Sequence, residues 1–141
     1  ALEKLLAIKN RTAGKGFITL IKDWEDLTKL VRPLSGDEKS ILETYWPGQV
    51  TVILPALPGL PTLLTGGRET IAVRMPKADY MQAYLHAWGA PLISTSANLS
   101  GHPPATTTAD LFTNIPPLKT PTPLKGGVST VIDSTTGQKL R

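Results

Sequence analysis

The stretch Thr70–Pro76, which reads TIAVRMP, decides how this chain folds, because its side chains alternate between two kinds. Successive side chains of a β-strand point to opposite faces of the sheet. One face of this stretch is apolar and consists of Ile71, Val73 and Met75. The other face is small and polar and consists of Thr70, Ala72 and Arg74. The alternation therefore predicts a half-buried strand that presents a single guanidinium group on its polar face.

Working outward from this strand, helical and strand patterns interleave along the chain. Further strands are predicted at 17–21, at 49–54, from 91 onward and over 127–133, with another beginning at 139. Helices are predicted at 1–8, from the Asp23 cap to Pro33, from the Ser35 cap to about Tyr45, over 78–88 and around 109–112. The Pro- and Gly-rich segments 55–67 and 115–125 are predicted to be loops. This order of elements predicts an α/β or α+β fold built on a mixed sheet.

The length and composition are those of one globular domain. The chain has 141 residues, of which 40% are hydrophobic and 18% are charged, and this is enough for a real core. Its formal net charge is +4, with a pI near 9.5 and no long Lys/Arg block. A basic soluble protein is the simpler interpretation of this charge, and a polyanionic or RNA ligand is the alternative.

Several classes of protein are excluded or disfavoured. The chain has no cysteine, which rules out disulfides and thiolate chemistry. His86 and His102 lie far apart without a partner at metal-ligand spacing, so no protein metal site is predicted. No apolar run is long enough for a membrane span and no signal peptide is visible, so we expect a cytoplasmic protein with no membrane partner.

The loop after the first predicted helix concentrates positive charge. Lys9, Arg11 and Lys15 lie close together beside two glycines, where cations and free backbone amides could hold a triphosphate. The pattern is not a Walker A loop. A solvated basic loop explains the same residues on spacing alone.

Arg74 is the second candidate, because it lies in a strand on a face otherwise occupied by Thr70 and Ala72. A forked guanidinium in small, polar surroundings suits bidentate binding of a carboxylate. An edge-strand arginine that points to water is the alternative.

The run Pro91–Gly101 is the third candidate, since a short apolar strand ends there in small hydroxyl and amide residues. Ser96 and Asn98 belong to this run, and Ser129 with Thr130 forms a similar pair in the last strand. Helix capping, an Asx-turn or ordinary strand propensity would also explain these residues. No covalent nucleophile or paired carboxylates stand out. The residues therefore favour catalysis by positioning and charge stabilisation, as in nucleotidyl transfer.

Taken in order, several motifs resemble the YrdC-like family, whose members are threonylcarbamoyl-AMP synthases. They are Lys9-x-Arg11, Trp46-Pro47-Gly48, Ile71-Ala72-Val73-Arg74-x-Pro76, Ser94-Thr95-Ser96-Ala97-Asn98-x-Ser100-Gly101 and Val128-Ser129-Thr130-Val131-x-Asp133. They span almost the whole chain, and the Lys-x-Arg and Ser-x-Asn pairs are the family's active-site signatures. The resemblance implies a twisted mixed or parallel sheet with flanking helices around a basic concave cavity.

The resemblance also implies an activity. ATP, L-threonine and bicarbonate would be condensed to threonylcarbamoyl-AMP with release of pyrophosphate. Proteins of a tRNA-modification complex would then pass the threonylcarbamoyl group to an adenosine next to the tRNA anticodon. Mg²⁺ is expected with ATP, with the phosphates themselves as its main ligands.

The family's roles transfer to this chain by motif position. The implied catalytic residues are Lys9, Arg11, Ser96 and Asn98. The implied ATP-binding residues are Lys9, Arg11, Lys15, Thr70, Asn98, Thr106 and Arg141. The implied threonine-binding residues are Arg74, Ser96 and Ser129.

The chain also departs from the family pattern. We expect residues 1–141 to form a single domain of the short bacterial type that lacks the family's N-terminal strand and loop, because the chain begins in helical register. Thr12 stands where proline is usual. A non-catalytic module of the same fold that binds double-stranded RNA or tRNA is the competing interpretation. The related domain of hydrogenase-maturation carbamoyltransferases ranks below both.

Overall fold

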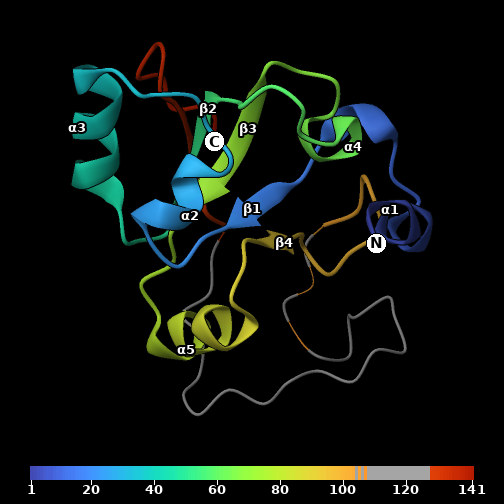
Figure 1. The fold of residues 1–141 in the computed structure, drawn as a ribbon. Coiled ribbons are helices and arrows are strands. Elements are labelled where there is room, and N and C mark those ends of the chain that lie inside the picture. Colours follow the sequence, from blue (N-terminus) through green and yellow to red (C-terminus); the bar gives the residue numbers. More distant parts are fainter. Residues whose placement is uncertain (104, 106, 108–127) are drawn as a thin grey trace.

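The computed structural model describes residues 1–103, 105, 107 and 128–141, and Figure 1 shows their arrangement. The helices are α1 (Leu2–Lys9), the short 3₁₀ helix η1 (Ala13–Lys15), α2 (Trp24–Thr28), α3 (Gly36–Tyr45), α4 (Thr62–Thr65) and α5 (Asp79–Trp88). The strands are β1 (Ile18–Leu20), β2 (Val50–Pro55), β3 (Thr70–Arg74), β4 (Leu92–Ser94) and β5 (Thr130–Asp133). None of the helices in these residues has the length and apolar content needed to cross a membrane.

The strands form one mixed sheet in the order β4-β1-β3-β2-β5. Strand β3 pairs in parallel with β1 and antiparallel with β2. The outer strands add an antiparallel pair, β1 with β4, and a parallel pair, β2 with β5. The prediction of an α/β fold with a mixed sheet and flanking helices is confirmed. Because β3 lies at the centre, the interpretation of Arg74 as an edge-strand residue is wrong.

The two faces of the sheet differ as the TIAVRMP pattern predicts. Ile71 and Val73 are 1% and 0% exposed, whereas Thr70, Ala72 and Arg74 are only half-buried. The register places Ile53 of β2 and Ile18 of β1 beside Ala72, so these three side chains share the second face. We call the Ile71 side the packed face and the Arg74 side the open face.

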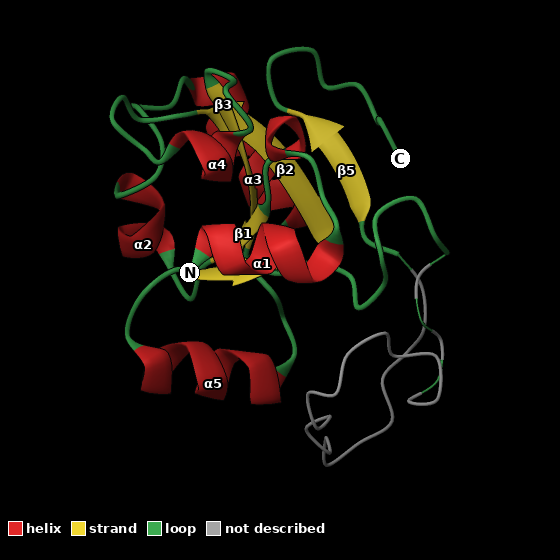
Figure 2. Cartoon of the chain, turned by 90° about the vertical axis from the view of Figure 1, so that its right-hand side faces the viewer, coloured by secondary structure: helices red, strands yellow, loops and turns green. Residues whose placement is uncertain are grey.

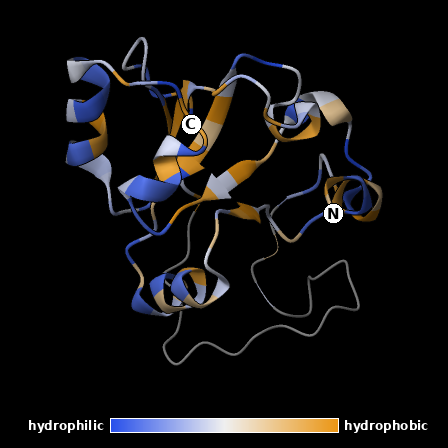
Figure 3. Ribbon diagram, in the orientation of Figure 1, coloured by the Kyte–Doolittle hydropathy of each residue, from blue (hydrophilic) through white to orange (hydrophobic). Residues whose placement is uncertain are grey.

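The helices supply the core of the packed face. Leu27 and Leu42 of α2 and α3 join Val52, Ile71 and Val73 of the strands in one buried cluster. Figure 1 shows α2 in front of the sheet with α3 and α4 to either side, and Figure 2 gives the view turned by 90°. In Figure 3 the strands are the most hydrophobic ribbon segments, while the outward sides of α2 and α3 are polar.

Local signals decide where the helices begin. The Asp23 carboxylate accepts a hydrogen bond from the Asp26 amide at 2.9 Å and so caps α2. Ser35 and Glu38 form the predicted capping box at the start of α3. Helix α2 nevertheless ends at Thr28 rather than near Pro33, because Val31 turns away and forms an isolated bridge with Ala56.

The other differences from prediction are confined to segments that tertiary contacts organise. The segment 55–67 is not entirely a loop, since Leu64 and Thr65 are buried and belong to α4. Helix α5 forms as predicted, but its apolar stripe is not fully packed: Leu85 is buried, and Trp88 is 59% exposed. Lys139 forms only an isolated bridge with Ile132 rather than beginning a strand. The helix predicted around 109–112 and the loop predicted at 115–125 lie outside the described residues.

Candidate active site

A cavity of about 390 Å³ opens beside the open face of the sheet. Ile18, Ile53 and Ala72 line it from three neighbouring strands, together with the hydroxyl residues Thr65 and Thr70. Three cationic residues, Arg11, Lys15 and Arg68, also line it. No carboxylate is among the described residues that line the cavity, so nothing there neutralises these charges. Such a cavity suits a polyanionic ligand.

Two glycines let the walls of the cavity approach each other. Gly16 has a φ of +58°, and a Cβ there would lie 2.9 Å from the carbonyl oxygen of Leu64. Gly66 has a φ of +68°, and a Cβ there would lie 2.6 Å from the amide nitrogen of Gly16. Both positions therefore require glycine for conformation and for space. The contact joins the basic loop to the turn after α4.

Arg11 is held in the cavity wall by its own loop. Its Nη2 donates a hydrogen bond to the Gly16 carbonyl at 2.8 Å, and its guanidinium lies 5.2 Å from the centre of the Phe17 ring. The buried Nε has no partner among the described residues. Burial lowers the pKa of Arg11, as expected for a cation with reduced access to water. Arg11 is therefore held in position by its loop, while its Nε–H donor is not used by the described residues.

Lys9 is not in a loop, as the sequence suggested, but is the last residue of α1, where it is 1% exposed. Its Nζ donates to the backbone carbonyls of Ser96 and Asn98. In the reverse direction, the amide of Ser100 donates to the Lys9 carbonyl at 3.1 Å. Burial first, and then the charge of Arg11, lowers the pKa of Lys9. Lys9 thus ties the loop after β4 to the end of α1.

The loop after β4 is also organised from within. The Ser96 hydroxyl donates to Asn98 Oδ1 at 2.5 Å, and Asn98 Nδ2 donates to the His102 carbonyl at 2.5 Å. Lys15 Nζ reaches the Ser100 hydroxyl at 3.1 Å, so the same loop contacts the rim of the cavity. The structure therefore brings Lys9, Ser96 and Asn98 together in one cluster next to the cavity.

Arg74 and Ser129 belong to a third group on the open face. Arg74 follows Thr70 and Ala72 along the same side of β3, so the face that lines the cavity continues to its guanidinium. Arg74 Nε is buried without a partner among the described residues. Burial lowers the pKa of Arg74, with the charge of Tyr80 opposing that shift. Arg141, another predicted residue, donates from Nε to the Ser129 carbonyl at 3.3 Å.

The sequence did not identify two further side chains in this region. Arg68 lines the cavity, although no strand or motif signal marked it. Thr51 lies buried in β2 and its hydroxyl is 3.3 Å from that of Ser129. Arg68 lies in the turn between α4 and β3, and Thr51 meets Ser129 through the pairing of β2 with β5. Thr106 lies outside the described residues.

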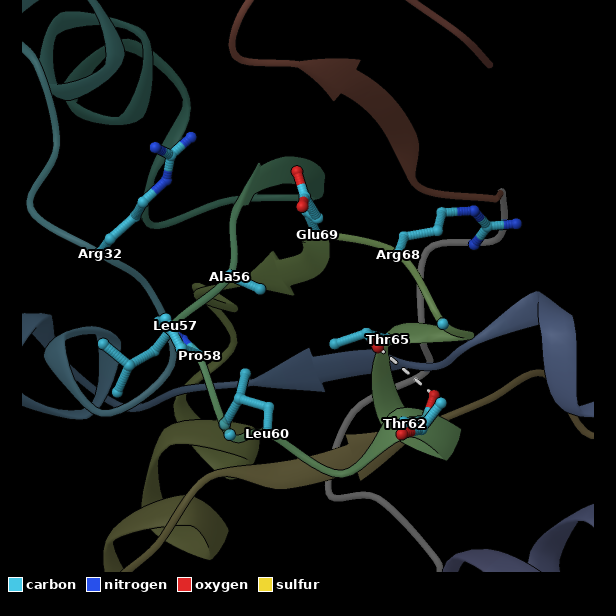
Figure 4. Close-up of a pocket in the computed structure, with 11 residues that line it drawn as sticks. Arg32, Ala56, Leu57, Pro58, Leu60, Thr62, Thr65, Arg68 and Glu69 are labelled. Atoms are coloured by element: carbon cyan, nitrogen blue, oxygen red, sulfur yellow. Dashed lines mark hydrogen bonds between the residues drawn. The ribbon is translucent and has the colours of Figure 1, made fainter.

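A second pocket, of about 480 Å³, lies on the other side of α4 and is drawn in Figure 4. Arg32 and Glu69 line this pocket but not the cavity, whereas Thr65 and Arg68 line both. In Figure 4 the side chain of Arg68 points away from Arg32. Arg32 is therefore a basic residue near the cavity that does not belong to it.

The described residues contain no cluster of three or more His, Cys, Asp or Glu side chains that could hold a metal ion. The cavity likewise has no carboxylate among its described lining residues.

The fold and the site together define an α/β protein whose sheet is packed on one face and presents cations and hydroxyls on the other. The chain belongs to the Sua5_yciO_yrdC family, described as "Telomere recombination", which matches residues 1–141.

Relatives within this family share a common name. The chain is 43% identical to "Threonylcarbamoyl-AMP synthase" of Idiomarina loihiensis over 79% of its own length and 61% of that protein. It is 37% identical to the protein of the same name from Nitrosococcus oceani, over its whole length and 79% of that protein.

A solved structure agrees with this assignment. The structure titled "Crystal structure of P. abyssi Sua5 complexed with L-threonine" matches with a TM-score of 0.78 and 28% identity, over 94% of this chain and 40% of that one. The chain thus spans about three fifths of the first relative and two fifths of this structural neighbour.

Proposed function

We propose that this chain forms the substrate-binding and catalytic region of a threonylcarbamoyl-AMP synthase, a nucleotidyltransferase. The observation that supports the proposal most directly is the cavity on the open face. Its described lining residues include Arg11, Lys15 and Arg68 and no carboxylate, and its face continues along β3 to the half-buried Arg74. A polyanion and a carboxylate can be held there side by side. The names of the relatives and the threonine complex of the P. abyssi protein support the same assignment.

The proposed reaction joins three substrates. The amine of L-threonine and bicarbonate give a carbamate with loss of water. A carbamate oxygen then bonds to the α-phosphorus of ATP, and the bond from that phosphorus to the bridging oxygen breaks. The bond pair leaves with pyrophosphate, so the products are threonylcarbamoyl-AMP and pyrophosphate. Preorganised positive charge around the phosphates is the main assistance that such a step needs.

We assign the parts of the substrates to residues of this chain by their positions in the site. Arg11, Lys15 and Arg68 would bind the ATP phosphates, and Thr70 would approach the nucleotide from the same cavity. Arg74 would pair with the threonine carboxylate, with Ser96 and Ser129 as hydroxyl partners. Asn98, Thr106 and Arg141 stay predictions for the nucleotide side. Mg²⁺ would enter with ATP and take its ligands from the phosphates.

The hydrogen bonds of Lys9 support a role in fixing the loop after β4. Its ammonium donates to the carbonyls of Ser96 and Asn98, so it fixes the loop that presents those two side chains. Direct contact between Lys9 and phosphate stays a prediction. We further propose that a partner complex transfers the threonylcarbamoyl group from the product to tRNA.

Pyrophosphate release from the purified chain tests this proposal. We expect release only when ATP, L-threonine and bicarbonate are all present, with threonylcarbamoyl-AMP detected by mass spectrometry. ATP turnover that ignores threonine would contradict the synthase. RNA binding with a steep dependence on salt and no pyrophosphate release would favour the binding module instead.

A further inference from the structure

Thr51 is a buried hydroxyl residue that the proposed roles do not use. It is the second residue of β2 and is 0% exposed. A hydroxyl shut off from water needs a hydrogen-bond partner within the protein. Among the described residues its side chain has one, the hydroxyl of Ser129 at 3.3 Å.

The register of the sheet places Thr51 between two residues proposed to bind threonine. Val52 pairs with Val73 in the antiparallel β2–β3 ladder, so Thr51 lies opposite Arg74 one step along it. On its other side Thr51 pairs with Val131 of β5, and Ser129 lies two residues before Val131. Residues two apart on a strand share a face, so the side chains of Arg74, Thr51 and Ser129 all lie on the open face.

The hydrogen-bonding capacities of the two hydroxyls suggest how they work together. Each hydroxyl has one proton and two acceptor lone pairs. If Thr51 donates its proton to Ser129 Oγ, the proton of Ser129 remains free for an acceptor on the open face. A carboxylate held by Arg74 is such an acceptor. Ser129 lies just before β5, and the contact with Thr51 holds the Ser129 hydroxyl on the open face.

We propose that Thr51 is a positioning residue for the amino-acid substrate, orienting the Ser129 hydroxyl beside Arg74. This inference rests on the proposed function, because it takes L-threonine as the ligand of the open face. Thr51 itself is buried and acts through Ser129.

The sheet offers a matched control in Thr19 of β1. Thr19 is also a strand threonine and is 2% exposed, but it faces the packed side of the sheet. Its hydroxyl has no partner among the described residues. Replacing either threonine with valine removes one buried hydroxyl and keeps the branched shape. The two substitutions differ in the face of the sheet that they alter and in the contact to Ser129, which only Thr51 makes.

Calorimetric titration of the chain with L-threonine tests the inference. We expect Thr51→Val to weaken threonine binding by about five- to tenfold, the effect of losing one well-placed hydrogen bond, while ATP binding stays unchanged. Thr51→Ser, which keeps the hydroxyl, and Thr19→Val should each stay within about twofold of the original affinity. In a chain that already has Ser129→Ala, Thr51→Val should cause no further loss, because its effect passes through Ser129.

The contrary outcomes are separable. Three outcomes would each overturn the inference alone. They are an unchanged affinity for L-threonine in Thr51→Val, an equal loss of affinity in Thr19→Val, and a full additional loss of affinity when Thr51→Val is added to Ser129→Ala. If the unsubstituted chain binds no L-threonine, the proposed function fails together with it. Thermal denaturation confirms that each variant is folded; if Thr51→Val is not, Thr51→Ala is titrated in its place with the same expectations.

Discussion

The two faces of the sheet differ in burial and in function, and the five residues of strand β3 show both kinds. Ile71 and Val73 are closed off by helices, and they contribute to stability through apolar burial. Thr70, Ala72 and Arg74 alternate with them but remain half-buried on a face with a basic cavity. One strand therefore belongs to both the core and the site. A substitution in β3 should change stability or ligand binding, depending on which face of the sheet the residue occupies.

The largest effect is expected from damage to the packed face. Ile71→Ala removes a side chain that is 1% exposed, so it should lower the free energy of unfolding by about 2–5 kcal/mol, measured by urea denaturation. Thr70→Ala, one position away on the open face, is the control and should change stability far less. Equal losses from both substitutions would mean that the two faces are packed alike.

On the open face the matching substitution is Arg74→Lys. Lysine keeps the charge but loses the planar fork, so the affinity for L-threonine should fall roughly 10- to 100-fold, as for loss of a charged hydrogen bond. Denaturation should show little change in stability. A normal threonine affinity in this variant would remove Arg74 from the site.

Within the cavity, Arg68 and Arg32 provide a matched pair. Arg68 lines the cavity and Arg32 does not, so Arg68→Gln should weaken pyrophosphate binding by about tenfold, whereas Arg32→Gln should leave it unchanged. Titration with inorganic pyrophosphate measures both variants. Equal loss in both would indicate a general effect of net charge rather than a defined cavity.

A smaller effect, present at neutral pH and lost in acid, is expected from Asp26 of α2, which is buried. Burial alone would raise the pKa of this carboxyl, but hydrogen bonds from Lys22 and Lys29 outweigh it, and the pKa is lowered. A lowered pKa in the folded state means a stabilising contribution that is present above the unfolded pKa, about 4, and is lost as the pH falls.

Asp26→Asn should therefore lower the melting temperature at pH 7 and differ less from the unsubstituted chain near pH 3. Thermal denaturation across this range measures the difference. A gap between the two proteins that does not narrow in acid would mean that the ion pairs contribute nothing.

Much of the fold and part of the site could be predicted because the signals are local. Strand alternation in 70–76, the Asp23 cap and the Ser35–Glu38 capping box depend on residues close in sequence, and all are confirmed. The predicted end of α2 was wrong and α4 was predicted to be part of a loop, because both elements depend on distant packing. The bridge of Val31 to Ala56 ends the first, and burial of Leu64 and Thr65 forms the second.

The sequence by itself determined the chemistry available to this protein: a central strand with one apolar and one polar face, a basic loop, and hydroxyl residues at strand ends. Which of these residues meet was decided only by the tertiary structure. Thr51 and Ser129 are 78 positions apart, and Lys9 and Ser96 are 87 apart. Alternation and capping arise from neighbours along the chain, whereas strand order joins segments with no local relation. Long-range contacts therefore placed Lys9 against the loop after β4, Arg68 in the cavity and Thr51 against Ser129.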